Sequence, residues 1–307
     1  MRLIKETNIH FIGQSRFAFF LSGTIILAGL ISLFLQGGPK LSIDFKGGTL
    51  VAVQFTGDMD VNDVRSVMGN VSIDGLIHDF SKAEIKRFGS SRDIAVRLPL
   101  MDDQPENFQQ LIVNHLYESF PENTPLDIND FILSMEKVGP KIGAELSGKA
   151  VMAIISALVL ILIYISIRFE FKFAVGAIAA LAHDVIITLG IFSMMDYEIS
   201  LPIIAAFLTI VGYSLNDTIV ILDRIRENVK GMKRVTFTEI VDRSLNDSLS
   251  RTIITSITTF FVVFVLYLFG GEVIHYFAFA MLIGVIVGTY SSIYVASPIV
   301  VQLHKRN

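Results

Sequence analysis

Six long stretches of the chain consist almost entirely of apolar residues, and each is long enough to cross a membrane as a helix. A bilayer core about 30 Å thick requires roughly 20 such residues in helical form. The pattern therefore predicts six membrane-spanning helices, at 17–35, 149–167, 173–195, 199–222, 252–269 and 274–303. No small-residue cleavage site follows the first stretch, so we expect a retained anchor rather than a cleaved signal peptide.

Lysine and arginine are unevenly distributed among the connections between these stretches. They precede the first, separate the second from the third, are numerous between the fourth and fifth, and follow the sixth, whereas 196–198 and 270–273 contain none. Because basic residues favour the cytoplasmic side, both termini are predicted to be cytoplasmic and 36–148 to be exported. The predicted cytoplasmic segments are the tails 1–16 and 305–307 and the loop 223–251.

The segment 36–148 has its own alternation of strand and helix patterns. Strand patterns cover 41–56, 76–80, 93–98 and 128–138, and helix patterns cover 61–68 and 105–120. This order is that of a ferredoxin-like α+β unit, and about 100 residues can enclose one core. We expect a folded domain that either contacts another protein or supports the helices, and that supplies no catalytic chemistry.

The composition agrees with a membrane protein and excludes several other functions. Hydrophobic residues make up 52% of the chain and charged residues only 18%, against about 25% charged in soluble domains. A net charge of −4 argues against nucleic-acid binding. The chain has no cysteine, and its six histidines are scattered, so we expect no disulfide, no metal and no cofactor.

Polar residues inside the fourth and fifth stretches are the main functional candidates, because a charge within a bilayer needs a partner or a task. Asp217 lies within the fourth stretch, and Arg251 opens the fifth. Helical spacing adds four polar side chains to their faces, Tyr213, Asn216, Thr255 and Thr258. Two interpretations are open: Asp217 and Arg251 conduct protons along a hydrated polar track, or they form a static ion pair that fixes helix packing.

A second carboxylate, Asp184, follows His183 in the third stretch. It either takes part in proton transfer or holds the helices together by hydrogen bonds. Two carboxylates on neighbouring helices are also the ingredients of an intramembrane aspartyl protease. However, the Gly-x-Gly-Asp pattern of those enzymes is absent before Asp217. In the sixth stretch, Gly284 and Gly288 form a small-residue stripe that suits close helix packing.

Several motifs follow one another from the first stretch to the last. They occupy 43–49, 88–94, 138–140, 182–185, 212–217, 223–227, 251–256 and 267–271. Together they resemble the SecF branch of the SecD/SecF family, which belongs to the resistance-nodulation-division superfamily. The family motif of the exported domain contains Asp44, Gly47 and Gly48; Lys46 departs from it, since many relatives carry a small or neutral residue there.

The resemblance implies a non-enzymatic subunit of the Sec machinery in the bacterial inner membrane, driven by the proton-motive force. The implied partners are SecD, the SecYEG channel with SecA on its cytoplasmic side, YajC and the secretory protein in transit. The family's proton-relay positions correspond to Asp217 and Arg251. A small-molecule efflux component of the same superfamily is the alternative, although such exporters usually contain twelve spans in one chain.

Overall fold

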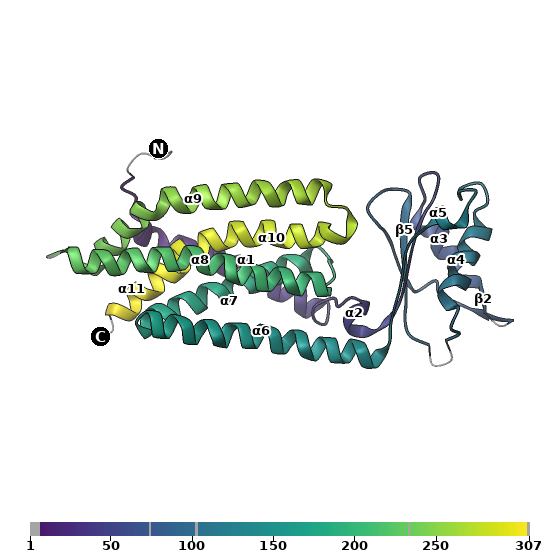
Figure 1. The fold of residues 1–307 in the computed structure, drawn as a ribbon, viewed down its shortest axis with the longest axis horizontal. Coiled ribbons are helices and arrows are strands. Elements are labelled where there is room, and N and C mark those ends of the chain that lie inside the picture. Colours follow the sequence, from purple (N-terminus) through teal and green to yellow (C-terminus); the bar gives the residue numbers. More distant parts are fainter. Residues whose placement is uncertain (1–6, 74, 102–103, 233, 306–307) are drawn as a thin grey trace. The chain divides into compact units, whose positions relative to one another are not determined.

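The computed structural model describes residues 7–73, 75–101, 104–232 and 234–305. The chain divides into a helical unit, formed by the residues up to Lys40 and from Ala150 onward, and a smaller unit, Leu41–Lys149. Figure 1 labels the elements of both. The predicted class, a polytopic helical protein with an α+β domain between its first two spans, is confirmed.

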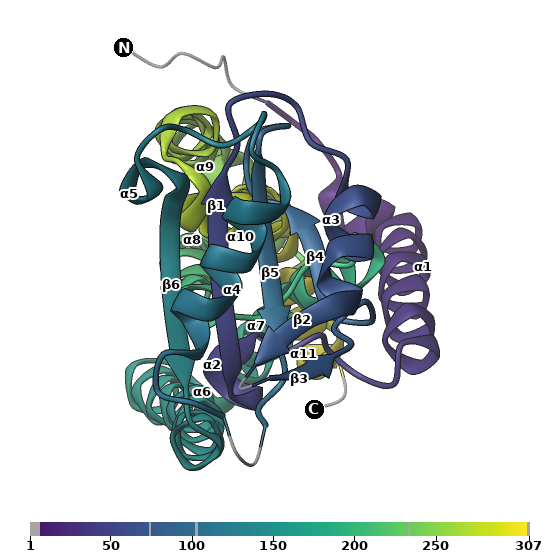
Figure 2. The same ribbon diagram turned by 90° about the vertical axis from the view of Figure 1, so that its right-hand side faces the viewer.

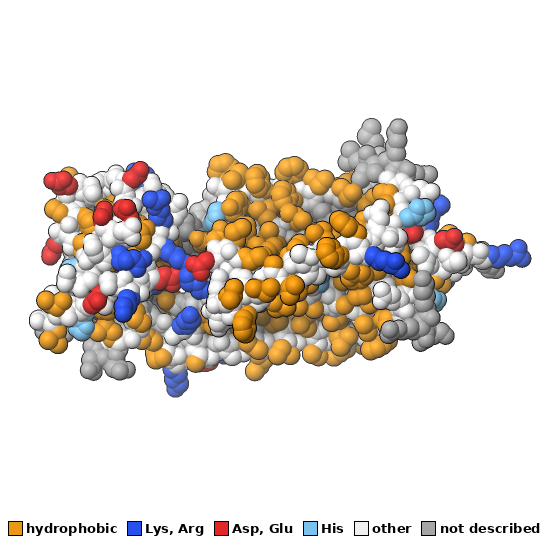
Figure 3. All heavy atoms as spheres, turned by 180° about the vertical axis from the view of Figure 1, so that it is seen from behind, with side chains coloured by type: hydrophobic (Ala, Val, Ile, Leu, Met, Phe, Trp, Pro, Cys, Tyr) orange, Lys and Arg blue, Asp and Glu red, His pale blue; other side chains and the backbone are white. Residues whose placement is uncertain are grey.

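Within the described ranges, six stretches of helix are long and apolar enough to span a membrane. They are α1 (Phe11–Leu35), α6 (Pro140–Arg168), α7 (Phe171–Met194), α8 (Leu201–Gly231), α9 (Phe237–Phe269) and a last stretch made of α10 (Glu272–Ser291) and α11 (Ser297–Lys305). Hydrophobic side chains cover much of the surface of these helices (Figure 3). Where the membrane begins and ends along each helix stays a prediction.

Several helices extend beyond the predicted stretches. The segment 223–251 is not mainly a loop, because α8 continues to Gly231 and α9 begins at Phe237. Thr236 and Glu239 form a reciprocal capping box at the start of α9. Apolar residues in its first turns, such as Val241, are buried. The helix α6 begins at Pro140 rather than at 149, since proline is favoured in a first helical turn.

The last stretch is interrupted by a π-helical turn, η2 (Ser292–Ala296). The Ser297 hydroxyl donates to the Ser292 carbonyl at 3.0 Å, which spans the widened turn. At the first residue of this turn, the hydroxyls of Ser292 and Thr218 lie 2.9 Å apart. Beyond the turn, α11 packs against α7.

The smaller unit contains a four-stranded antiparallel sheet in the order β4-β5-β1-β6. Its strands are β1 (Gly48–Gln54), β4 (Glu84–Arg87), β5 (Asp93–Leu98) and β6 (Ile132–Val138). Two helices, α3 (Val61–Val67) and α4 (Phe108–Ser119), cover one face (Figure 2). The core between sheet and helices includes Val51, Val96, Phe108 and Ile112. This order is the predicted ferredoxin-like topology.

Three predicted strands in this unit need correction. The pattern at 76–80 gives only β3 (Leu76–His78), which pairs with β2 (Val71–Ile73) in a separate hairpin, and β4 takes its place in the sheet. The predicted strands 41–56 and 128–138 each begin with a helical turn instead, α2 (Ile43–Lys46) and α5 (Ile128–Phe131). The side chains of Ser42 and Asp127 cap these turns, and such local bonds compete with strand formation. A short 3₁₀ turn, η1 (Met68–Asn70), follows α3.

The paired glycines join α2 to β1 in a conformation that other residues rarely adopt. Gly47 and Gly48 have φ values of 75° and 142°. A Cβ atom at Gly48 would lie 2.8 Å from the Leu98 carbonyl oxygen, and one at Gly47 would lie 2.6 Å from Leu100 Cδ1. Asp44 is half-buried in α2, where its amide donates to the Ser42 hydroxyl. Both positive φ and close packing therefore require glycine here.

We expect Gly48→Val to destabilise the smaller unit by roughly 3 kcal/mol, because backbone strain and a clash with the neighbouring strand add together. Thermal unfolding of the purified full-length chain measures this. The control is Gly57→Val, at a position with negative φ and no atom within 4 Å of the added Cβ. Equal stability of the two variants would contradict this account of the motif.

Candidate functional site in the helical unit

Asp217 lies on the inner side of α8 and is 4% exposed. Its Oδ2 atom is 3.5 Å from the Ser256 hydroxyl of α9, at the limit of a hydrogen bond. Ser256 lies much closer, 2.6 Å, to the Thr289 hydroxyl of α10, and Thr289 donates to a backbone carbonyl of its own helix. Because the hydroxyl proton of Thr289 is donated to that carbonyl, the short hydrogen bond between the two hydroxyls is donated by Ser256 to Thr289. The single hydroxyl proton of Ser256 is then used there, so Asp217 keeps only a long, weak contact.

Arg251, the other predicted relay residue, is exposed on α9. Among the residues that the structure describes, no salt bridge joins it to Asp217. The static ion pair considered from the sequence is therefore not formed in this structure. Arg251 lies at the start of the membrane stretch of α9, and its backbone carbonyl accepts a hydrogen bond from Thr255.

The structure separates the polar side chains that helical spacing had grouped together. Asn216 and Thr258 are exposed, and both Thr255 and Thr258 donate to carbonyls of their own helix. Tyr213 is half-buried, and its hydroxyl oxygen is buried with no hydrogen-bond partner among the described residues. Only Asp217 of this group turns fully inward. The prediction wrongly placed Asn216 on the same face as Asp217, because neighbouring residues of a helix point about 100° apart.

The inward polar residues of α9 form a row that the sequence interpretation missed. The row consists of Ser244, Ser248, Thr252 and Ser256, all buried. The row follows one face of α9 from its first turns to Ser256, which lies beside Asp217 of α8. The Thr252 hydroxyl is buried without a partner in the described part of the chain. The spacing of four residues was visible in the sequence and is typical of one helix face.

Asp184 is the best-bonded carboxylate among the buried residues described. Its Oδ2 accepts hydrogen bonds from Ser214 on α8 at 2.6 Å and from Ser291 on α10 at 2.8 Å. Its Oδ1 lies 2.9 Å from His183 Nδ1. The other ring nitrogen of His183 is 2.9 Å from Ser22 on α1. One carboxylate thus connects α1, α7, α8 and α10.

Small residues allow these helices to approach closely. A Cβ at Gly288 of α10 would lie 2.9 Å from the Cβ of Ser214, and one at Gly284 would overlap the side chain of Ile210. Gly29 of α1 and Gly190 of α7 are in similar contact. The predicted packing role of Gly284 and Gly288 is confirmed. The short distances let the hydroxyls of Ser214 and Ser291 reach Asp184.

The two buried aspartates are therefore chemically different. Asp184 has both oxygens occupied, which suits a structural role, whereas Asp217 has one long contact and spare hydrogen-bonding capacity. A carboxylate of the second kind can take up and release a proton without breaking the helix packing. Within the described ranges, no three histidine, aspartate or glutamate side chains lie together as a metal ion would require.

Comparison with known proteins places this architecture in a family. The family model for the protein export membrane protein SecD/SecF, C-terminal, matches residues 121–306. A protein translocase subunit SecF from Calditerrivibrio nitroreducens is 44% identical over 98% of this chain and 96% of its own length. The chain belongs to the SecF family. The SecF of Escherichia coli O157:H7 is 40% identical over 93% of this chain and 85% of its own length.

Solved structures support the same assignment. SecDF from Thermus thermophilus, described as a translocon-associated membrane protein, matches with a TM-score of 0.85 and 38% identity. The match covers 98% of this SecF-family chain but only 39% of the SecDF chain. A second SecDF structure, in a super-membrane-facing form, matches with a TM-score of 0.70 and 37% identity, over 99% of this chain and 40% of that one.

We expect Asp184→Ala to destabilise the helical unit by about 2 kcal/mol, because three donors lose their acceptor and each such bond is worth about 0.6 kcal/mol in a membrane protein. Unfolding of the purified chain in mild detergent measures the change. Asp217→Ala is the matched comparison and should cost much less, since only one long contact is lost. Equal losses in the two variants would contradict the distinction between the carboxylates.

Proposed function

We propose that this chain works with a SecD partner in the Sec machinery and uses the proton-motive force to promote protein export across the bacterial inner membrane. Family membership supports a role in protein translocation, since the relatives are named protein translocase subunits. The SecDF neighbours support the SecD partner, because this chain accounts for only 39% of one of those chains. SecYEG with SecA, YajC and the secretory protein are the further partners proposed from the resemblance. Copurification after mild solubilisation would test the assembly, and absence of a SecD-like protein from the eluate would count against it.

The observation that carries the proton-driven part is the weakly bonded carboxylate of Asp217, deep inside the helices. In the proposed cycle, Asp217 takes a proton from one side of the membrane through water held along the polar residues. Movement of the cationic Arg251 toward Asp217 then favours the charged carboxylate and drives the proton off. The hydroxyls of Thr252 and Ser256 lie on the buried face of α9, with Ser256 3.5 Å from Asp217 Oδ2, and the buried hydroxyl of Tyr213 adds a polar group on α8.

Asp217→Asn should reduce gradient-dependent export in inner-membrane vesicles by about tenfold or more, to the level without a gradient, because Asn keeps the shape but carries no proton. Asp217→Glu should retain partial activity. Arg251→Lys should be poor, since a compact ammonium lacks the planar fork of guanidinium.

The double variant Asp217→Asn, Arg251→Met separates this proposal from a purely structural pair. A structural pair predicts recovery when both charges are removed together, whereas a relay predicts no recovery. Protein amounts are matched by immunoblot. Normal gradient-dependent export in Asp217→Asn would contradict the relay.

An exposed polar face on α8 and α9 supports a partner within the membrane. Thr209 and Asn216 on α8 and Arg251 and Thr258 on α9 are all exposed, although they lie on membrane-spanning helices. Polar groups facing lipid are costly, so this face requires a protein cover. We propose that the membrane helices of SecD provide it.

A single cysteine at Asn216 or Thr258 should form crosslinks with SecD in membranes, because both positions lie on the proposed interface. The natural absence of cysteine makes such variants unambiguous. Phe20→Cys, on an apolar and 75% exposed part of α1, is the control and should remain uncrosslinked. Crosslinking to SecD from Phe20 alone would place the interface elsewhere.

The proposed orientation has both termini in the cytoplasm and the ferredoxin-like unit on the outer side. A phosphatase reporter that is active only outside should work when joined at Asn114 and fail when joined at Arg234. The reverse activities would overturn this topology. In this position, the ferredoxin-like unit would meet SecD or the emerging secretory chain, and crosslinkers along α4 during active export would trap that partner.

A further inference from the structure

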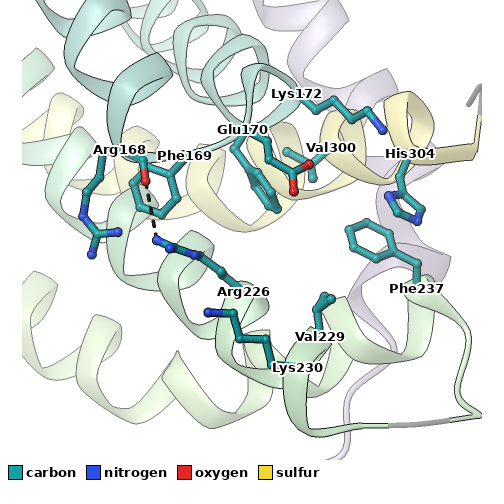
Figure 4. A pocket seen from close by; sticks show the side chains of 11 residues that line it. Arg168, Phe169, Glu170, Lys172, Arg226, Val229, Lys230, Phe237, Val300 and His304 are labelled. Carbon is teal, nitrogen blue, oxygen red and sulfur yellow. Dashed lines mark hydrogen bonds between the residues drawn. The ribbon is translucent and has the colours of Figure 1, made fainter.

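A cavity of about 380 Å³ opens at one end of the helical unit, where five helices meet. Its lining comes from the end of α6, the first turn of α7, the end of α8, the start of α9 and α11. Figure 4 shows Arg168, Arg226 and Lys230 gathered at one side, Phe237 and His304 at the other, and Glu170 between them. The rings of Phe237 and His304 stack with centroids 3.8 Å apart and form one wall.

The charge of this lining is strongly positive. Its basic side chains are Arg168, Lys172, Arg226 and Lys230, against the single carboxylate of Glu170. Arg168 is paired with Asp223 at 3.1 Å. Among the described residues, Arg226 and Lys230 form no salt bridge, and the described polar contact of Arg226 is to the Arg168 carbonyl at 3.5 Å. Two cations therefore remain available to an anion.

The backbone adds a further positive contribution at the same place. The helix α7 begins at Phe171, and the side chain of its N-cap residue, Glu170, makes no capping hydrogen bond. The first amides of this 24-residue helix are thus free of a side-chain cap. Such a terminus favours negative charge.

The surroundings of the cavity point to a ligand with an apolar part. Ile167 and Phe171 flank the connection between α6 and α7 and are 82% and 69% exposed. Val229, in the lining itself, is 44% exposed. A phosphate held by the cations would therefore have an uncovered apolar surface beside it, at the end of the membrane-spanning helices.

We propose that this cavity binds the headgroup phosphate of an anionic phospholipid, whose acyl chains lie along the exposed surface beside Ile167 and Phe171. Arg226 and Lys230 hold the phosphate, with Arg168 beside them. Glu170 opposes the negative ligand and limits the affinity. The site is separate from Asp217 and does not depend on the proposed role in export.

Native mass spectrometry of the purified full-length chain, titrated with dioleoylphosphatidylglycerol in detergent, tests this assignment. The double variant Arg226→Gln, Lys230→Gln should bind about twentyfold more weakly, since each basic residue contributes about fivefold to anionic lipid binding. Glu170→Gln should bind the lipid a few times more tightly, because the substitution removes a negative charge that repels the phosphate. Arg243→Gln is the matched control, because Arg243 is also basic, is 68% exposed and lies outside the cavity.

Three comparisons can overturn the proposal. Equal binding of dioleoylphosphatidylcholine would show that only acyl chains are recognised. Equal affinity for inorganic phosphate would assign the site to a soluble phosphate compound instead. Unchanged phosphatidylglycerol binding in a folded double variant would place the lipid elsewhere. If the double variant fails to fold, Lys230→Gln alone, at an exposed position, should still lose about fivefold.

Discussion

Three donors converge on the carboxylate of Asp184, and the arrangement of the helical unit depends on that convergence. Hydrogen bonds from Ser214, Ser291 and His183 fix α8 and α10 against α7, and His183 extends the network to Ser22 on α1. The interior of a membrane offers little water to replace a lost partner. The network is therefore a strict geometric requirement on four helices at once.

This requirement also explains the small residues around it. A hydroxyl is short, so Ser214 and Ser291 reach the carboxylate only if the helix backbones lie close together. Gly284 and Gly288 permit that approach. With the packing secured by Asp184, Asp217 is not needed as a bonding centre. In the proposed cycle, Asp217 changes its protonation while the fully hydrogen-bonded Asp184 maintains the helix packing.

The sequence predicted the number of long helices and the topology of the ferredoxin-like unit, because both follow from strong periodic patterns. It did not predict that 76–80 would leave the sheet, since strand propensity does not specify a pairing partner. It also grouped Asn216 with Asp217, although the structure exposes one and buries the other. Periodicity gives relative directions around a helix, but the direction of the core comes from neighbouring helices. For that reason the four-residue spacing of Thr252 and Ser256 could be seen in the sequence, but that this face of α9 is buried became clear only once α8 and α10 were placed beside it.

The π-helical turn η2 allows the last stretch to satisfy two neighbours that an uninterrupted α-helix would place out of phase. Ser292, the first residue of the turn, faces Thr218 on α8; beyond the turn, Val300 lies against Gly176 on α7. A π turn accommodates one additional residue and so rotates everything beyond it by about 100°. The number of residues between these two contacts is therefore as constrained as their chemistry. Along this segment, insertions and deletions face a stricter limit than side-chain exchanges, and the spacing itself carries structural information.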